Sequence, residues 1–328
     1  MAKPDMSVHP NQVLRLASLN GLRIREDVAY TNYKGEEHGG TLKRVSKILD
    51  KLGPVLQRIL APDETVLYVA RMQAPVSLVE QLTMGWYLYR VSAATLVLTN
   101  RRIIQLLVDG GGKWRGNLRT VAWGDVVEAK VKGWLSPVLW LKYRNGRKDK
   151  YWRLKHADAK KIKVLAATLL PASSGESTAA QGMVALCPDC LAPLTEKVYV
   201  CGGCGLVFKD EKTMTKRALL LPGGGYFYTG HTFLAVGDLI VEVFLMFEVI
   251  VCALAAYATW GKTPAKPGAP TGSTFLVTTL FFLALLAFEK LVTIYHGRRF
   301  VREFISTGQR DPMRMHSAAA GAAGAGWK

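Results

Sequence analysis

Four cysteines stand in two pairs whose spacing suits metal binding. Cys187-Pro-Asp-Cys190 and Cys201-Gly-Gly-Cys204 are separated by ten residues. Each Cys-x-x-Cys turn offers two sulfur ligands from one tight knuckle, and Zn²⁺ prefers four such ligands at tetrahedral angles. Because all four positions are cysteines, no position is left for a reacting water, which favours structural over catalytic zinc. Iron held by the same four sulfurs is the main alternative, and a redox-active dithiol is a minor one.

This C-x2-C-x10-C-x2-C spacing resembles the zinc-ribbon and rubredoxin-like families over roughly residues 185–210. We therefore predict a zinc ribbon at 183–210, with a short hairpin through Val198–Val200 that brings the knuckles together. A module of this size cannot bury a sufficient core, so metal binding should supply most of its folding free energy. The fifth cysteine, Cys252, lies in an apolar run, and this usage of thiols suits a reducing compartment.

Two apolar runs follow the cysteines and approach the roughly 20 residues that a membrane span needs. Leu239–Tyr257 is the first, and Phe275–Tyr295 is the second, interrupted at Glu289-Lys290. The Pro- and Gly-rich stretch 261–272 connects them. We predict a membrane hairpin over residues 217–296.

Basic residues flank the outer ends of this hairpin. They are Lys209, Lys212, Lys216 and Arg217 before the first span, and Arg298, Arg299, Arg302, Arg310 and Arg314 after the second. The connecting loop has only Lys262 and Lys266. Because basic loops stay on the cytoplasmic side, we expect a multi-pass protein of a bacterial inner membrane with both termini in the cytoplasm. Residues 1–10 show no apolar core of a cleavable signal peptide.

Three acidic residues, Asp238, Glu242 and Glu248, interrupt or adjoin the first span. A carboxylate deep in a bilayer costs roughly 2.5–3.5 kcal/mol, so these groups need partners or protonation. One interpretation is neutral carboxyls bonded to Thr278, Thr279 or a neighbouring helix, with Asp238 at the interface. The other is a cation or proton path lined by several subunits. We expect Glu242 to link the hairpin to a neighbouring copy.

A glycine-rich turn precedes the first span. Residues 219–231 read Leu-Leu-Leu-Pro-Gly-Gly-Gly-Tyr-Phe-Tyr-Thr-Gly-His, which must break a helix and places aromatic residues at an interface. Over residues 217–260 the sequence resembles a family of two-helix transmembrane domains. The turn lacks the following Gly-Lys-Ser/Thr of a phosphate-binding loop.

Residues 61–170 read as short strands closed by one helix. Val66–Val69, Thr95–Leu98 and Ile103–Val108 are β-rich runs, and Asn145-Gly146 is a strong hairpin signal. The stretch from Ala157 to Leu170 has helical periodicity. This pattern predicts a small antiparallel barrel or sandwich capped by a helix.

The same region resembles the bacterial pleckstrin-homology-like (PH-like) family. The resemblance is carried by Ala61-Pro-Asp-Glu64, Leu98-Thr-Asn-Arg-Arg-Ile-Ile104, Val121-Ala-Trp-Gly-Asp-Val126 and Tyr143-Arg-Asn-Gly146. It implies a seven-stranded bent barrel with a C-terminal helix, and either a lipid ligand or a role in self-assembly. The stretch Ala74–Ala93 departs from the family by its length, and we expect a helix or a membrane- or subunit-facing insertion there.

The remaining segments are less regular. We predict an N-terminal helical region at 1–60, with a short helix at Val13–Leu19 and an amphipathic helix from Thr41 that bends at Gly53-Pro54. Residues 171–182 are predicted to be a flexible linker. A basic, Ala- and Gly-rich cytoplasmic tail is expected at 297–328.

The chain carries a formal net charge of +18, which favours anionic partners. Because membrane-length runs are also present, anionic lipid headgroups are the simpler partner, and nucleic acid is the less favoured one. The candidate lipid-facing residues lie around the predicted hairpin of the β-rich region: Lys142, Arg144, Arg147, Lys148, Lys150 and Arg153.

No histidine has the spacing of a metal ligand or catalytic base, and no nucleophile or nucleotide motif is present. The sequence thus predicts an α+β multidomain membrane protein: a PH-like barrel, a zinc ribbon and a two-helix hairpin. As a function we expect a non-enzymatic, membrane-anchored scaffold or adaptor that self-associates into a homo-oligomer. An oligomeric channel or transport component and a membrane-tethered nucleic-acid-binding protein are the alternatives.

Overall fold

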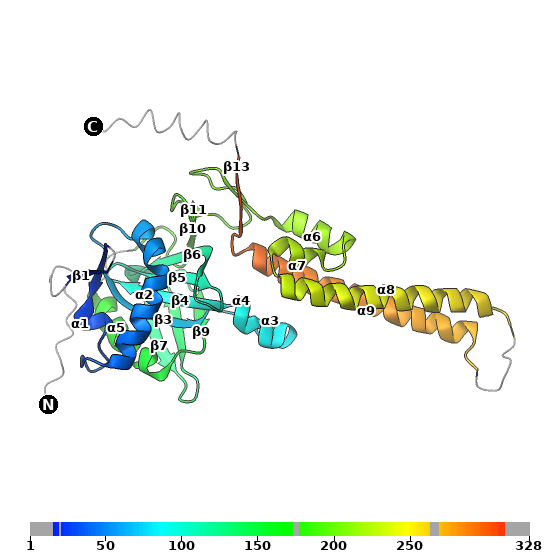
Figure 1. The fold of residues 1–328 in the computed structure, drawn as a ribbon, viewed down its shortest axis with the longest axis horizontal. Helices are drawn as coiled ribbons and strands as arrows, with labels where there is room; N and C mark the ends of the chain where they lie inside the picture. Colours follow the sequence, from blue (N-terminus) through cyan, green and yellow to red (C-terminus); the bar gives the residue numbers. More distant parts are fainter. Residues whose placement is uncertain (1–15, 20, 173–176, 263–268, 312–328) are drawn as a thin grey trace. The chain divides into compact units, whose positions relative to one another are not determined.

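The computed structural model of the protein describes residues 16–19, 21–172, 177–262 and 269–311 (Figure 1). The chain divides into two compact units, residues 1–195 and 196–328. We call the first the β unit and the second the hairpin unit. The β unit holds the large hydrophobic core, whose buried members lie between Leu22 and Leu169. The hairpin unit has a small cluster formed by Met214, Ala218 and Val301.

A mixed eight-stranded sheet forms the centre of the β unit, in the order β1-β2-β3-β4-β5-β6-β10-β11. Its strands are β1 (Leu16–Leu19), β2 (Leu22–Arg25), β3 (Val66–Gln73), β4 (Ala93–Thr99), β5 (Arg102–Val108), β6 (Trp114–Ala122), β10 (Val184–Leu186) and β11 (Pro193–Leu194). β2 and β3 run parallel, and the other neighbours run antiparallel. Nearly every residue of β4 and β5 is buried, which explains why these strands are continuous apolar runs without alternation.

A second sheet contains β7 (Val126–Lys132), β8 (Val138–Tyr143) and β9 (Lys148–Tyr151). The predicted hairpin at Asn145-Gly146 is confirmed, because β8 and β9 pair antiparallel across it and Gly146 adopts φ +80°, a conformation that glycine reaches at no steric cost. A bridge between Gln73 and Trp152 joins the two sheets. Thus β3 to β9 are seven strands, and they are followed by helix α5 (His156–Ala172).

Further helical segments complete the β unit. α2 (Gly39–Ile59) buries a stripe that includes Val45, Leu49, Leu52 and Leu56, the spacing that the sequence pattern predicted. The helix continues through Pro54. The long stretch after β3 is helical as expected, with α3 (Leu78–Met84), the 3-10 turn η1 (Gly85–Tyr87) and α4 (Leu88–Val91). Two shorter elements are α1 (Glu26–Ala29) and η2 (Trp123–Asp125).

Two predictions for the β unit need correction. Leu16–Leu19, predicted as part of a helix, form β1, which pairs with β2; Val13 to Arg15 lie outside the described residues. β10, predicted as part of a separate ribbon, pairs with β6 and so extends the main sheet. In the predicted linker, Ser177 and Thr178 hydrogen-bond the buried carboxylate of Asp125, at 2.6 Å for the Ser177 hydroxyl.

The hairpin unit contains α6 (Glu211–Leu220), α7 (Gly224–Thr229), and two long helices, α8 (Thr232–Thr259) and α9 (Gly272–Val301). α8 and α9 lie side by side, with α6 and α7 packed at one end of the pair (Figure 1). The predicted break at Pro222 is present, because α6 ends at Leu220 and Gly223 adopts φ +66° before α7. Within the predicted tail, β13 (Ser306–Arg310) pairs with β12 (Leu206–Phe208); residues 312–328 lie outside the described part.

Candidate metal centre and buried carboxylate cluster

The two cysteine knuckles have the same backbone geometry. In the first, Leu191 N–H donates to Cys187 C=O at 3.0 Å and Cys187 N–H to Ala192 C=O at 2.9 Å. In the second, Gly205 N–H donates to Cys201 C=O at 3.0 Å, and Cys201 N–H donates to the carbonyl five residues on at 2.9 Å. This turn, which occurs in both knuckles, places the two sulfurs of each pair on the same side of their knuckle.

The four sulfur atoms form one cluster. The Sγ atoms of Cys187, Cys190, Cys201 and Cys204 all lie within 4.8 Å of one another, and none is in a disulfide. In a tetrahedral thiolate site with a metal–sulfur distance of about 2.3 Å, the sulfurs are about 3.8 Å apart, so the cluster has the compactness that a metal site requires. Gly203 N–H also donates to Cys201 Sγ at 3.4 Å, which favours the thiolate that a metal binds. The predicted ligand set is therefore brought together and fits a metal ion.

The hairpin helices carry a second cluster of potential ligands. Asp238 and Glu242 of α8 and Glu289 of α9 place one carboxylate oxygen each within 4.8 Å of one another. Glu242 is 1% exposed, and the other two are half-buried. The cluster lies at the end of the apolar stretches away from the connecting loop, since Asp238 directly precedes Leu239–Tyr257 and Glu289 directly follows Phe288.

Glu242 and Lys290 hold the turn between α6 and α7. Glu242 Oε2 accepts from Lys290 Nζ at 2.7 Å and from Gly223 N–H at 3.2 Å. Lys290 Nζ also donates to the carbonyl oxygen of Ala218, near the end of α6, at 2.6 Å. Glu242 thus has its partner on the neighbouring helix α9 of its own chain, one of the alternatives that we named beside Thr278, Thr279 and a second copy. The hydroxyls of Thr278 and Thr279 donate to carbonyls of α9 itself.

Glu248 does not belong to this cluster, although the sequence grouped it with the other acids. It is half-buried farther along α8. Glu289 and Lys290 were the residues that sequence reasoning missed. Their positions in the sequence could have indicated this. Glu289 and Lys290 lie about as far from the connecting loop in the second apolar run as Asp238 and Glu242 lie in the first. The antiparallel helices of a hairpin bring such positions together.

Aromatic residues of the glycine-rich turn pack against α9. The Tyr226 hydroxyl lies 2.9 Å from His296 Nδ1, and the rings of His231 and Phe300 stack with centroids 3.8 Å apart. Burial raises the pKa of Tyr226 above its ordinary value, so its hydroxyl stays protonated. Gly223 could not carry a side chain here, because a Cβ would overlap the carbonyl of Ala235.

The predicted lipid-facing residues are all exposed, and the structure divides them into two groups. Lys142, Lys148 and Lys150 lie on the outer face of the second sheet, where Lys142 pairs with Lys148 across β8 and β9. Lys150 covers the Trp140 ring at 4.1 Å. Arg144 instead donates to the Gly124 carbonyl at 2.6 Å, and Arg153 stacks on Tyr89. Arg147 lies in the connecting turn.

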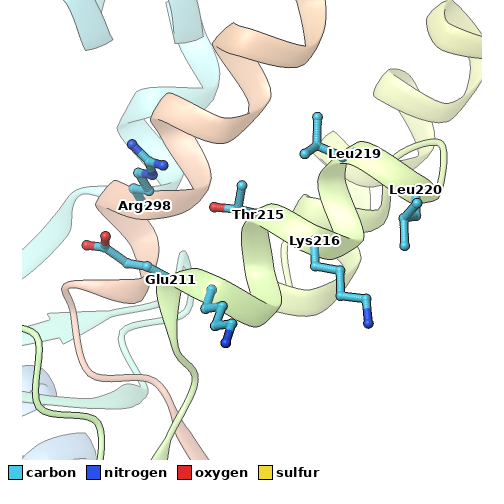
Figure 2. Close-up of a pocket in the computed structure, with 7 residues that line it drawn as sticks. Glu211, Thr215, Lys216, Leu219, Leu220 and Arg298 are labelled. Carbon is cyan, nitrogen blue, oxygen red and sulfur yellow. The ribbon is translucent and has the colours of Figure 1, made fainter.

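Two surface hollows carry basic side chains. One, of about 510 Å³, is in the β unit and is lined by Arg44, Lys47, Ile48, Arg71, Met72, Gln73, Tyr89, Arg153, Lys155 and Asp158. The other, of about 730 Å³, is an open hollow of the hairpin unit, where α6 residues Glu211, Lys212, Thr215, Lys216, Leu219 and Leu220 lie beside Arg298 of α9 (Figure 2). Both combine several cations with few acids, which favours anionic ligands.

Comparison with protein-family models, with curated proteins and with solved structures finds no match to this chain. A function is therefore inferred from the geometry of the sites alone.

Proposed function

We propose that this protein is a non-enzymatic scaffold or adaptor anchored in a bacterial inner membrane by the α8–α9 hairpin. Both termini face the cytoplasm, where the β unit and a structural Zn²⁺ centre are presented to partners. The protein self-associates, and its β unit contacts anionic lipid.

The main support for this proposal is the exposed apolar surface of the two long helices. α8 and α9 are long and apolar enough to cross a membrane, and their most apolar windows are only 22% and 0% buried. A core helix of a water-soluble protein hides such a face against other elements. Large exposed apolar surfaces instead mark contact with lipid or protein, and two adjacent helices of this length suit a bilayer about 30 Å thick.

The charges and thiols support the proposed topology. Basic residues are concentrated at the ends of the hairpin away from the loop, which is the cytoplasmic side of most membrane proteins. Four reduced cysteines in one cluster suit the same compartment. Among thiolate-binding metals, Zn²⁺ best fits a closed four-sulfur site with no redox task, and iron is the competitor.

Exposed apolar tips support contact between the β unit and a bilayer. Trp134 and Leu135, in the loop between β7 and β8, are 82% and 77% exposed. On α3, Leu78 and Leu82 are 70% and 77% exposed. Apolar side chains at loop tips beside basic ones are typical of proteins that dip into the headgroup region.

The bases of both segments adjoin residues 152–154 of the β unit. Leu154 N–H donates to the Pro137 carbonyl, which anchors the β7–β8 loop beside the segment between β9 and α5. Trp152 bridges to Gln73, from which the α3 segment begins. Arg153 lies between them and stacks on Tyr89.

Extraction of the full-length protein from bacterial membranes tests the anchor. We expect the protein to stay in the membrane pellet after washes with high salt and alkaline carbonate, and to be released only by detergent. Release by carbonate would contradict a spanning hairpin. Subunit counting of the detergent-free protein in native nanodiscs tests self-association, and a uniform single copy would contradict it.

Hydrogen exchange tests the lipid contact of the β unit. In nanodiscs that contain anionic lipid, backbone amides of residues 132–138 and 77–86 should exchange more slowly than in neutral nanodiscs. The double variant Trp134→Glu plus Leu135→Glu should lose this protection, whereas Leu42→Glu, at an exposed apolar position of α2, should keep it. Equal exchange in both lipids would contradict the contact.

The carboxylates within the hairpin favour a channel or transport component as the second candidate. Conductance of the reconstituted protein in planar bilayers distinguishes the two. A selective current that changes in Glu242→Gln would replace the scaffold with the channel, and an absence of current in a protein shown to be inserted supports the scaffold.

A further inference from the structure

We propose that Asp238, Glu242 and Glu289 form a binding site for one hard divalent cation, such as Ca²⁺, at the end of the α8–α9 hairpin. This site is separate from the four-cysteine cluster, and nothing in the proposed scaffold function requires it.

The first observation is a set of carboxylate oxygens that the protein leaves without partners. Asp238 Oδ2, Glu242 Oε1 and Glu289 Oε2 are buried, and no N–H or hydroxyl group of the described residues donates a hydrogen bond to any of them. The side chain of Glu242 is 1% exposed. Buried acceptors nearly always find a partner in a folded protein, so three neighbouring orphans indicate a missing ligand.

The second observation is the balance of charge. Three ionised carboxylates carry three negative charges, and Lys290 of the ion pair with Glu242 supplies one positive charge. The remaining two negative charges are crowded together on partly or fully buried side chains, which is costly unless a counter-charge is bound. One divalent cation neutralises the cluster.

The third observation is a shared hydroxyl. Thr293 Oγ1 lies 3.0 Å from Asp238 Oδ1 and 2.8 Å from Glu289 Oε1. A hydroxyl has one hydrogen, so it can satisfy only one of these two oxygens. The other oxygen, together with the orphans, remains available as a ligand, and the hydroxyl oxygen itself can become a ligand.

The geometry is that of an oxygen-ligand site. Two ligands on opposite sides of one Ca²⁺, each at about 2.4 Å, are about 4.8 Å apart. The ligand atoms of the three residues all lie within 4.8 Å of one another. Carboxylate and hydroxyl oxygens suit hard cations such as Ca²⁺, Mg²⁺ and Mn²⁺ rather than the metals that thiolates select. Because Asp238 and Glu289 are only half-buried, an ion can reach the site from the end of the hairpin.

Direct binding of Ca²⁺ to the full-length protein in nanodiscs tests the site. The protein is first freed of calcium with EGTA, and ⁴⁵Ca²⁺ binding is then measured at constant ionic strength. Anionic lipid also binds Ca²⁺, so the nanodiscs contain only zwitterionic lipid. We expect saturable binding of one ion per chain, accompanied by a rise in the thermal-unfolding midpoint.

Variants locate the ion. Asp238→Asn and Glu289→Gln should each weaken binding at least about tenfold, because affinity in such sites depends on the number of charged ligands. Glu248→Gln, a matched change on α8 outside the cluster, should bind as the wild type does. Near-ultraviolet circular dichroism checks that each variant is folded, and Mg²⁺ and Mn²⁺ are tested as competitors of ⁴⁵Ca²⁺.

Three results would overturn the proposal. One is no saturable binding of Ca²⁺ and no effect of Mg²⁺ or Mn²⁺ on the unfolding midpoint. Another is undiminished binding in the double variant Asp238→Asn plus Glu289→Gln. The last is an unfolding midpoint that depends on pH and on Glu289 but on none of these cations, which would mean that protons neutralise the cluster.

Discussion

Buried carboxylates are treated differently in the two units of this protein. In the β unit, Glu64 accepts hydrogen bonds from Arg102, Thr99 and the Ala61 amide. Asp158 accepts from Arg44 at 2.5 Å and from Tyr68 at 2.7 Å. Among the described residues, neither group has a fully buried oxygen without a partner. In the hairpin unit, each of Asp238, Glu242 and Glu289 has one orphan oxygen.

This difference indicates that the buried carboxylates of the two units have different roles. In the β unit each of these carboxylates has a guanidinium partner within the chain, although Arg44 Nε itself lacks a partner among the described residues, so the pairs fix how α2, β3, β5 and α5 meet. The carboxylates of the hairpin are incomplete, although Glu242 and Lys290 hold the α6–α7 turn in the same way. A carboxylate cluster in which some oxygens hold the fold and others lack hydrogen-bond partners is the arrangement expected of a binding site.

The largest effect should come from breaking a complete pair in the β unit. Glu64→Gln leaves the Arg102 guanidinium without its counter-charge, and removal of one partner of a buried ion pair costs about 3–5 kcal/mol. The adjacent pair of Asp63 and Arg101 is exposed on both sides, so Asp63→Asn should cost less than about 1 kcal/mol. Denaturant unfolding measures both. Equal losses would mean that burial does not set the strength of these pairs.

A smaller effect is expected for Lys290→Met in the hairpin. The change removes charged hydrogen bonds to Glu242 and to the Ala218 carbonyl, at a cost of about 2–3 kcal/mol in calcium-free buffer. Saturating Ca²⁺ should recover part of the loss, because the bound ion replaces the missing positive charge. Lys262→Met, in the exposed loop, is the matched control. A loss that Ca²⁺ leaves unchanged would separate the ion pair from the proposed site.

Lys161 tests whether every buried charge of the β unit has a charged hydrogen-bond partner. The residue is 1% exposed, and its ammonium group donates to two neutral acceptors, Thr31 Oγ1 and the Asn32 carbonyl. Burial lowers the pKa of Lys161 from 10.5 to about 8, and Asp27 only partly opposes this shift. The β unit thus holds one buried charge that its own fold disfavours.

Because the folded pKa of Lys161 is the lower one, the unfolded chain binds the extra proton between about pH 8 and 10.5. Stability should therefore rise with pH across this window, by at most about 1.4 kcal/mol per pH unit. Lys161→Met should remove the rise, and the difference between wild type and variant isolates this residue from titrating tyrosines. A flat difference between pH 7.5 and 9.5 would contradict the lowered pKa.

Local patterns predicted much of this fold. The spacing of Leu49, Leu52 and Leu56 predicted α2, Asn145-Gly146 predicted the β8–β9 turn, and the cysteine spacing predicted the thiol cluster. Each of these signals lies within a few residues of the chain or follows from ligand geometry.

Long-range pairing could not be predicted in the same way. β10 joins β6 through Leu186 and Leu118, and β12 joins β13 about a hundred residues later through Leu206 and Arg310. Short strands of this kind have no period that distinguishes them from loops or helices, which also explains the helix wrongly predicted over Leu16–Leu19. The acids of α8 were recognised, but their contacts with Lys290 and Thr293 depend on the register of two helices.

Two ligand sets in one chain, one of sulfur and one of oxygen, are tested most directly by the metal-to-protein ratio of detergent-extracted, full-length protein. Elemental analysis should give about one zinc per chain. Cys201→Ser plus Cys204→Ser should lose it, and Asp238→Asn plus Glu289→Gln should keep it while losing bound calcium. A folded wild-type protein with four reduced thiols and no metal, or zinc that persists without Cys201 and Cys204, would contradict the thiolate centre on which the proposed cytoplasmic arrangement depends.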